Sequence, residues 1–371
     1  MIDPAQVRAA YDRAVALGYL PQGVPVGTGR HAATQAVASE LGMSLAQVKR
    51  LLLKPVEAPQ KPRVRVPAGV APSPEPEPAP MFPGGLLPSP AFVNGPRFSF
   101  TTEPDHTFAF GAVGDCHLGS KYERLDVLED LYDYFAERGV TTVFHTGNWI
   151  DGEARFNVHD LHTRGVDAQL RYLAKHYPQR PGITTYAVTG DDHEGWYAQR
   201  EGIDIGAYAQ RVFRDAGRTD WVDLGYMEAP VRLVDASSGR AAIASIVHPG
   251  GGATYAASYA VQKVIESLDG GEKPAAWIGG HWHSVLLTLM VRNVWCVLTG
   301  CTQDQTPFLR KKRVAAMVGG HLCRATIDPR TGAITGLMDD ARHYFNRGYY
   351  AGRWSHHGPI NAAERVGLEA A

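Results

Sequence analysis

A run of apolar residues that ends in a short polar turn constrains the fold of this chain more than any other feature. Residues Thr107 to Val113 are apolar enough to form a buried strand, and Gly114 ends the run. Asp115 and His117 follow at once, and side chains two positions apart in an extended segment point the same way. A carboxylate and an imidazole in one cavity suit a divalent transition metal. The pair alone is weak evidence, because a loop aspartate beside a surface histidine is common.

Four further segments carry the same kinds of side chain, and each follows a predicted strand. These segments span residues 147–151, 190–194, 248 and 280–283. Ligands of open α/β sheets bind at the carboxyl ends of the strands. The sequence therefore predicts that all five polar segments meet in one crevice.

Strands and helices alternate in the first part of this region and strands dominate the second part. The early strands are expected at 107–113, 140–146 and 183–189, with helices at 124–138, 164–176 and 204–216. A helix is expected at 255–267, among closely spaced strands at 231–234, 242–247, 275–278, 286–291, 294–298 and 322–327. The alternation predicts a mostly parallel sheet, and the later strands predict a second sheet packed on it.

In their order along the chain, the five segments resemble the sequence blocks of the calcineurin-like metallophosphoesterase superfamily, over about residues 107–285. The resemblance implies a four-layered α/β/β/α sandwich with two divalent metal ions, of manganese, iron, zinc or magnesium. One ion would be held by Asp115, His117 and His283, and the other by Asp192, His248 and His281, with Asn148 between them. His193 would be the catalytic residue that contacts the phosphate or protonates the leaving oxygen.

Two positions depart from the pattern of that superfamily. The bridging position is usually aspartate and is Asn148 here, whereas the third block has Asp191 and Asp192 where a single asparagine is usual. The two changes are reciprocal in charge, which predicts that Asp192, or Asp191, takes over the bridge between the metals. Asp151 is another candidate for this role. The alternative is that Asn148 impairs the enzyme.

The first 54 residues form a predicted helical module. Residues 38–48 resemble the helix-turn-helix family, with a small residue where the helices cross and Gly42 in the turn. Gln47, Lys49 and Arg50 would then face DNA. The module has six basic and three acidic residues, a modest excess that favours nucleic acid. The alternative is a structural or protein-binding three-helix bundle.

A proline-rich linker is expected over residues 55–104. Thirteen of the 25 prolines lie between residues 55 and 100, and proline removes amide donors, so the run is expected to join neither helix nor sheet. The metallophosphoesterase domain is then expected over 105–350, followed by a loosely ordered tail over 351–371.

Composition bounds the partners and the location of the protein. The net charge of −1 gives no global attraction to nucleic acid or to anionic membranes, so any attraction is local. Four cysteines without C-x-x-C spacing are typical of reduced thiols. No signal peptide or membrane-spanning run is found, and we expect a cytoplasmic protein without a membrane partner.

Local features point to nucleic acid as the partner, DNA rather than RNA. Arg310, Lys311 and Lys312 form a basic cluster that would suit a polyanionic substrate, or else a solvated turn. Trp149, Trp196 and Trp282 each neighbour a motif residue, as core aromatics or as stacking surfaces for bases.

The function predicted first is a metal-dependent phosphodiesterase or nuclease acting on DNA, a domain combination expected of phage proteins. The second enzyme reading is a phosphomonoesterase or nucleotide hydrolase, in which the N-terminal module serves only assembly. The third is a DNA-binding or scaffold protein that is impaired at Asn148.

Overall fold

The computed structural model describes residues 6–7, 9–11, 34, 37–52, 96–252, 254–269 and 271–350. The chain separates into two compact units, residues 1–81 and residues 82–371. No helix in the described ranges is both long and apolar enough to cross a bilayer.

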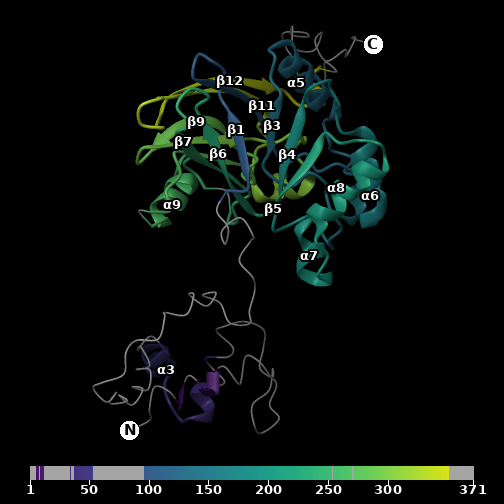
Figure 1. Ribbon diagram of the computed structural model, residues 1–371. Coiled ribbons are helices and arrows are strands. Elements are labelled where there is room, and N and C mark those ends of the chain that lie inside the picture. The colour runs from purple at the N-terminus through teal and green to yellow at the C-terminus, as the bar shows by residue number, and fades with distance from the viewer. Residues whose placement is uncertain are drawn as a thin grey trace, which may run out of the picture. The chain divides into compact units, whose positions relative to one another are not determined.

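Two six-stranded sheets form the larger unit (Figure 1). The first sheet has the order β12-β11-β2-β3-β4-β5, and its strands are β2 (Thr107–Val113), β3 (Thr142–His145), β4 (Thr184–Thr189), β5 (Trp221–Tyr226), β11 (Val318–Ile327) and β12 (Ile334–Tyr344). Strands β2 to β5 are parallel, whereas β11 runs antiparallel to β2. The parallel part therefore directs the carboxyl ends of three predicted strands to one edge.

The second sheet has the order β1-β6-β7-β8-β10-β9. Its strands are β1 (Phe98–Thr101), β6 (Glu228–Val234), β7 (Ala241–Val247), β8 (Ala276–Gly279), β9 (Leu286–Val291) and β10 (Val294–Thr299). Strands β7 and β8 are parallel, so their carboxyl ends also meet at one edge.

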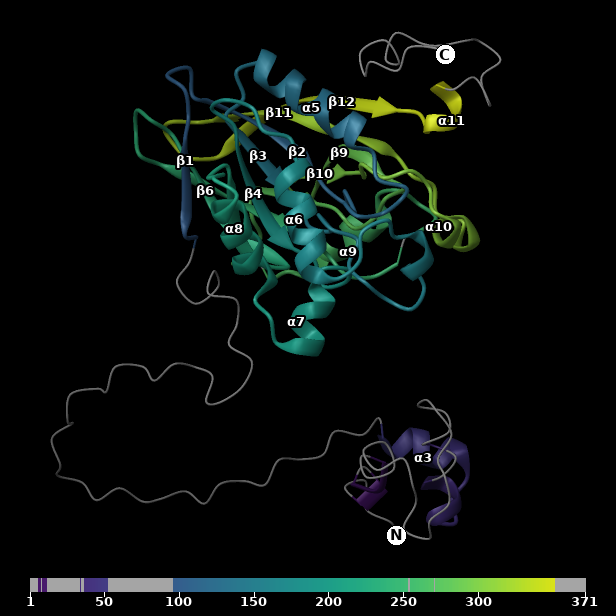
Figure 2. The same cartoon turned by 90° about the vertical axis from the view of Figure 1, so that its right-hand side faces the viewer.

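Helices cover the outer faces of the two sheets. The described helices of this unit are α5 (Leu125–Glu137), η1 (Val158–Asp160), α6 (Val166–His176), α7 (Gly195–Glu201), α8 (Ile205–Asp215), α9 (Tyr259–Ser267), α10 (Pro307–Lys312) and α11 (Arg347–Tyr350). Figures 1 and 2 show α5, α6 and α8 on the side of the first sheet, and Figure 1 shows α9 on the opposite side.

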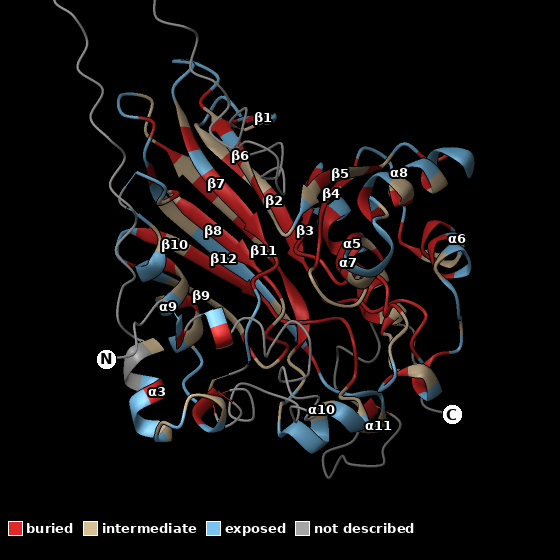
Figure 3. Cartoon of the chain, turned by 90° about the horizontal axis from the view of Figure 1, so that it is seen from below, coloured by how far each residue is buried: buried red, intermediate tan, exposed pale blue. Residues whose placement is uncertain are grey.

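Three apolar cores separate four layers. Leu128 and Phe135 of α5 pack with Leu170 of α6 against the first sheet. A second core lies between the sheets and contains Phe110, Phe144, Val231 and Ile278, among others. Val261 and Ile265 of α9 pack with Trp277 on the outer face of the second sheet. The buried strands in Figure 3 form the centre of this arrangement, and the predicted α/β/β/α sandwich is confirmed.

The start of the sandwich corrects the predicted linker. Residues 98–101, placed within the linker of 55–104, form β1, which pairs in parallel with Val231–Val234 of β6. Phe100 is buried because its ring packs against those of Phe108, Phe144 and Tyr186. The strand was missed because it is short and follows Pro96 closely. Residues 55–95 lie outside the described ranges.

Other elements were also missed. Strands β5 and β12 and helices α7 and α10 were not predicted. Helix α11, at the end of the predicted domain, was not predicted either, and Tyr350 is buried there. The expected tail over 351–371 lies outside the described residues.

The N-terminal unit has a small apolar core of its own. Val7, Ala10, Val37, Ala38 and Val48 are buried together. Helix α3 (Leu45–Leu52) of this unit follows Gly42, which lies in the left-handed region at φ 60°. This agrees with helices packed across a tight turn, but the helix-turn-helix identity stays a prediction.

A reciprocal cap begins α3. The Ser44 hydroxyl accepts the Gln47 backbone N–H at 3.3 Å, and the Gln47 side-chain oxygen accepts the Ser44 N–H at 2.9 Å. Gln47, which was expected to face DNA, therefore stabilises the helix start. Lys49 is exposed on the same helix, and Arg50 follows it.

Candidate metal centre

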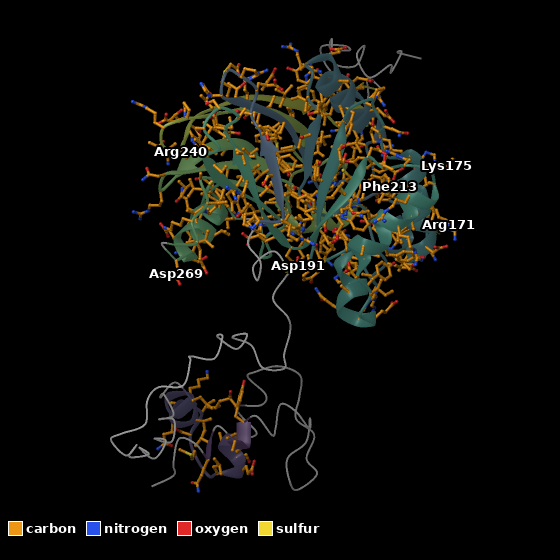
Figure 4. All side chains as sticks on the ribbon, in the orientation of Figure 1. Arg171, Lys175, Asp191, Phe213, Arg240 and Asp269 are labelled. Carbon is orange, nitrogen blue, oxygen red and sulfur yellow. The ribbon has the colours of Figure 1, made fainter. Side chains whose placement is uncertain are left out.

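All five polar segments meet at the carboxyl ends of their strands. The backbone N–H of Asp115, after β2, donates to the carbonyl of Gly147, after β3, at 3.0 Å. A carboxylate oxygen of Asp115 accepts the backbone N–H of His281, after β8, at 2.7 Å. Asp191 follows β4 and lies at the same edge of the sandwich (Figure 4). The loops of both sheets are thus joined directly by hydrogen bonds.

Asp115, His117 and His283 form the first metal-binding group, a set whose ligand atoms lie close enough together to hold one ion. Nε2 of His283 lies 3.2 Å from Oδ1 of Asp115 and 3.1 Å from Nε2 of His117. All three side chains are buried. Nδ1 of His117 donates to the carboxylate of Asp151 at 3.0 Å, which turns Nε2 toward the group. These residues match the set predicted for one ion.

The second group comes from Asp191, Asp192, His248 and His281. Nε2 of His248 lies 3.3 Å from Oδ1 of Asp192 and 3.2 Å from Nδ1 of His281. The other nitrogen of His248 donates to the carbonyl of Thr146 at 2.7 Å, and that of His281 donates to the carbonyl of Gly251 at 2.6 Å. When the two rings are neutral, these bonds leave the facing nitrogens as acceptors, the state in which imidazole binds a metal.

Asn148 lies between the two groups. Its Nδ2 donates to Oδ1 of Asp115, in the first group, at 3.3 Å. A Cβ at Gly190 would lie 2.4 Å from Asn148 Oδ1 and 3.2 Å from Nε2 of His248, in the second group. Asn148 Oδ1 is buried and accepts no hydrogen bond from any described residue. Because a buried unpaired oxygen is costly, this atom suits a metal ligand.

The contacts of Asp192 belong to the second group. Its carboxylate faces His248 and lies 3.7 Å from Nδ1 of His281 and 4.0 Å from Nε2 of His193. The bridging role predicted for Asp192 or Asp191 therefore stays a prediction, since Asn148 occupies the place between the groups.

His193 stands beside both groups, held by Asp151. Nδ1 of His193 donates to the backbone carbonyl of Asp151 at 2.7 Å and lies 3.3 Å from its carboxylate. Burial alone would lower the pKa of His193, but the carboxylates of Asp151 and Asp192 raise it to about 10. The two carboxylates thus favour the protonated ring, in which Nε2 holds a proton.

Glu194 fixes the loops that carry the site, a role that sequence reasoning missed. Its buried carboxyl oxygen accepts the backbone N–H groups of Asn148 and Gly190, both at 2.8 Å. Burial raises the pKa of Glu194 to about 7. The sequence feature that could have indicated this role is the position of Glu194 directly after His193, in the segment 190–194.

Five site residues have left-handed backbone, with φ of 51° at Asp115, 49° at His117, 54° at Asn148, 49° at His193 and 71° at His281. Positive φ is uncommon outside glycine and accumulates at functional sites, where surrounding contacts hold it. The predicted neighbourhood of Asp115 and His117 is confirmed, but the reason is different. The two side chains meet because both residues turn, and not because the segment is extended.

A cavity of about 380 Å³ opens on the site. His117, Asn148, Asp192, His193, His281 and His283 line its polar side, and Phe156, Phe308, Leu309 and Val314 line its apolar side. Lys312 also reaches this cavity. Arg310 instead bonds Gln305 and borders a neighbouring cavity, and Lys311 is exposed.

His145 and Cys116 are buried beside the site and contact each other. His145 is buried, and its Nε2 lies 3.1 Å from the Cys116 sulfur. Burial lowers the pKa of His145 to about 3, so the ring is neutral. Trp149 and Trp282 are buried, whereas Trp196 is partly exposed and stacks on His193.

No protein-family model and no curated protein matches the chain. Solved structures with similarity include Vps29 from Entamoeba histolytica, at 12% identity over 64% of this chain and all of that one, with a TM-score of 0.29. GAP50 of Plasmodium has 12% identity over 65% of this chain and 90% of its own, with a TM-score of 0.35. The phosphoesterase YfcE from E. coli has 10% identity over 62% and 98%, with a TM-score of 0.30.

Two sheets with helices on both outer faces carry the polar segments at their strand ends. The fold that the sequence predicted from its resemblance to calcineurin-like metallophosphoesterases is thus the fold of this chain.

Proposed function

We propose that this protein is a metal-dependent phosphoester hydrolase with two adjacent cation sites. The observation that carries the proposal is the pair of donor groups, Asp115 with His117 and His283, and Asp192 with His248 and His281, that open on one cavity. Carboxylate and imidazole donors suit divalent manganese, iron or zinc. Asn148 Oδ1, buried and unpaired among the described residues, completes the set between the groups.

Cations bound there would offset the charge of a phosphate and lower the pKa of a bound water to roughly 7. The other steps fall to side chains of the chain itself. His193 carries a proton at Nε2 and faces the cavity, so it can bind the phosphoryl oxygen or protonate the leaving oxygen. Asp151 orients both His193 and His117 through separate hydrogen bonds.

A diester is the substrate class that we favour within this proposal. Lys312 adds positive charge at the cavity mouth, and Lys49 adds charge on α3 of the N-terminal unit, which supports a nucleic-acid substrate. DNA, with α3 orienting the protein on it, remains our first choice.

The test compares bis-p-nitrophenyl phosphate with p-nitrophenyl phosphate. The full-length protein is freed of metal with a chelator and then titrated with manganese while bound metal is measured by elemental analysis. We expect two ions per chain and faster hydrolysis of the diester than of the monoester. Faster hydrolysis of the monoester would favour the alternative phosphomonoesterase, and metal binding without hydrolysis would favour an impaired enzyme. A protein that binds no metal would overturn the proposal.

A further inference from the structure

A row of contacting aromatic rings connects His193 with the basic helix α10. His193 and Trp196 stack with centroids 5.0 Å apart, and the Trp196 ring meets the edge of Phe156 at 5.8 Å. Phe156 and Phe308 stack at 4.5 Å with planes 25° apart. Nζ of Lys312 lies 5.7 Å from the Phe308 ring centre. We call Trp196, Phe156 and Phe308 the aromatic wall.

The two phenylalanines come from distant parts of the chain and border the same cavity as the metal-binding groups. Phe156 lies in the loop after β3, and Phe308 lies in the first turn of α10. Thr306 caps that helix by accepting the Leu309 N–H at 3.2 Å, which stabilises the turn that carries Phe308. Phe156 and Phe308 nevertheless keep 38% and 37% exposure, although burial of such rings is favourable.

We infer that the aromatic wall binds the nucleobase of a nucleotide whose phosphate lies at the metal-binding groups. The inference rests on the proposed phosphoester hydrolysis and names the substrate for that same site. An exposed aromatic pair beside a phosphate-binding centre offers a face for stacking, which tolerates every base. Lys312, at the far end of the wall, adds a positive charge that a second phosphate of a nucleotide chain can meet.

The size of the cavity restricts how the base is presented. Its volume of about 380 Å³ lies near the lower end of the range for small-molecule sites, roughly 300 to 1,000 Å³. A base within a duplex is covered on both faces by its neighbours and is not free to stack on protein rings. The wall therefore favours a nucleotide ester or the end of a single strand over the middle of a duplex.

The experiment compares two esters with one leaving group, the p-nitrophenyl esters of thymidine monophosphate and of ethyl phosphate. Loading with manganese is the same for both. Stacking of one base contributes a factor of roughly 5 to 150, so we expect the ratio of kcat/KM values to fall by that factor when Phe156→Ala and Phe308→Ala are combined. The leucine pair, Phe156→Leu with Phe308→Leu, keeps apolar volume but loses the ring faces, and is expected to lose the preference too.

The chain offers a matched control pair. Phe345 and Tyr349 also stack with planes 25° apart, at 4.4 Å, and neither borders the cavity. Phe345→Ala removes a ring of similar exposure, 41%, and is expected to leave the ratio unchanged. If the wall variants leave the ratio unchanged as well, or if the parent does not prefer the thymidine ester, the inference is wrong.

Two further measurements distinguish a single-stranded from a duplex substrate, and distinguish the aromatic subsite from the proposed hydrolysis. The cleavage rates of single-stranded and duplex oligonucleotides of one sequence are compared. Equal rates for the two, unchanged in the wall variants, would contradict the inference. Calorimetric titration measures the affinity for thymidine monophosphate relative to that for inorganic phosphate, and so reports binding of the base to the wall without turnover. If neither ester is hydrolysed, the proposed function fails, while a loss of thymidine monophosphate affinity in the wall variants still supports the aromatic subsite, and no loss rejects it.

Discussion

The Nε2 atoms of His117 and His283 lie 3.1 Å apart, although 166 positions separate the two residues in the sequence. His117 follows β2 of the first sheet and His283 follows β8 of the second, so the pair joins the two halves of the sandwich. Two imidazole nitrogens this close, with Oδ1 of Asp115 3.2 Å from one of them, are arranged to share a cation. A metal bound here would link the two sheets.

The first prediction concerns these ligands. We expect Asp115→Ala, His281→Ala and His283→Ala each to reduce phosphodiesterase activity by on the order of 100-fold or more, since even residues that only orient ligands cost 10- to 100-fold. Metal content should fall in each variant, measured by elemental analysis. His159→Ala is the control, because that side chain is 74% exposed and belongs to none of the metal-binding groups. Full activity with unchanged metal in any ligand variant would exclude the site.

The second prediction concerns the start of the folded unit. Phe100→Ala is expected to lower the free energy of unfolding by about 3 kcal/mol, because its ring fills a space among Phe108, Phe144 and Tyr186. Ser99→Ala, at an exposed position of the same strand, is the control.

The same reasoning predicts how truncated proteins behave. A protein that begins at residue 96 retains β1 and should unfold at a higher denaturant concentration than one that begins at residue 105, which leaves the edge of β6 open. Equal stability of the two would show that β1 adds nothing to the sandwich.

Strand β2 shows what the sequence could predict and β5 shows what it could not. The run Thr107–Val113 was predicted with its observed bounds because it is apolar almost throughout. In β5 the apolar pattern is broken by Asp223 and Gly225, so residue propensities did not predict a strand. These residues form a strand because they pair with β4. Strand β1 was missed because it is short and lies at the edge of its sheet.

Some residues of the site could likewise be predicted from the sequence, and others could not. The metal-binding residues could be predicted because parallel strands bring their carboxyl ends together, whatever the details of the loops. The aromatic wall could not, because the contact of Phe156 with Phe308 depends on how two separate loops fold over the cavity. The left-handed backbone at Asp115 and His117 likewise has no signal in residue type alone.

The third prediction is a pH dependence away from the metal centre. Burial raises the pKa of Asp223 from 3.8 to about 6. The folded protein therefore holds this proton between pH 3.8 and 6 while the unfolded chain releases it, so stability falls as pH rises through that window and stays lower above it. Asp223→Asn keeps an oxygen that accepts the Gly225 N–H.

The measurement is denaturant unfolding of parent and Asp223→Asn at pH values from 4 to 8. The gain in stability of the variant should grow between pH 4 and 6 and then level off, at up to about 3 kcal/mol. A difference that does not change with pH would show that Asp223 titrates normally.

The fourth prediction tests the N-terminal unit. Lys49→Ala combined with Arg50→Ala should weaken binding of duplex DNA and reduce the slope of log affinity against log salt by about one to two, since each phosphate contact releases counterions. The control pair is Lys175→Ala with Arg240→Ala, two exposed basic residues of the sandwich (Figure 4). Gln47 is left in place because it caps α3. No salt-dependent binding by the parent would make the unit an assembly element.

The last prediction concerns the exchange of charge between Asn148 and the third segment. Two adjacent dications repel each other, and an anionic ligand offsets that repulsion in a way that a neutral amide does not. Asp192 supplies such a charge to the second group, 3.3 Å from His248, while Asn148 supplies an oxygen between the groups. We therefore expect Asp192→Asn to lose the second metal and most activity, and Asn148→Asp to change activity only modestly.

An enzyme disabled at Asn148 makes the opposite forecast. Asn148→Asp would then restore activity by orders of magnitude from a baseline near zero, because aspartate at this position would bridge both groups. Both variants are compared with the parent for hydrolysis of bis-p-nitrophenyl phosphate and for metal content. Asp191→Asn is the matched control, since it removes the neighbouring acid of the same metal-binding group. If Asp191→Asn, rather than Asp192→Asn, loses the second metal, the relocated charge belongs to Asp191; a large gain from Asn148→Asp would reject the relocation of charge altogether.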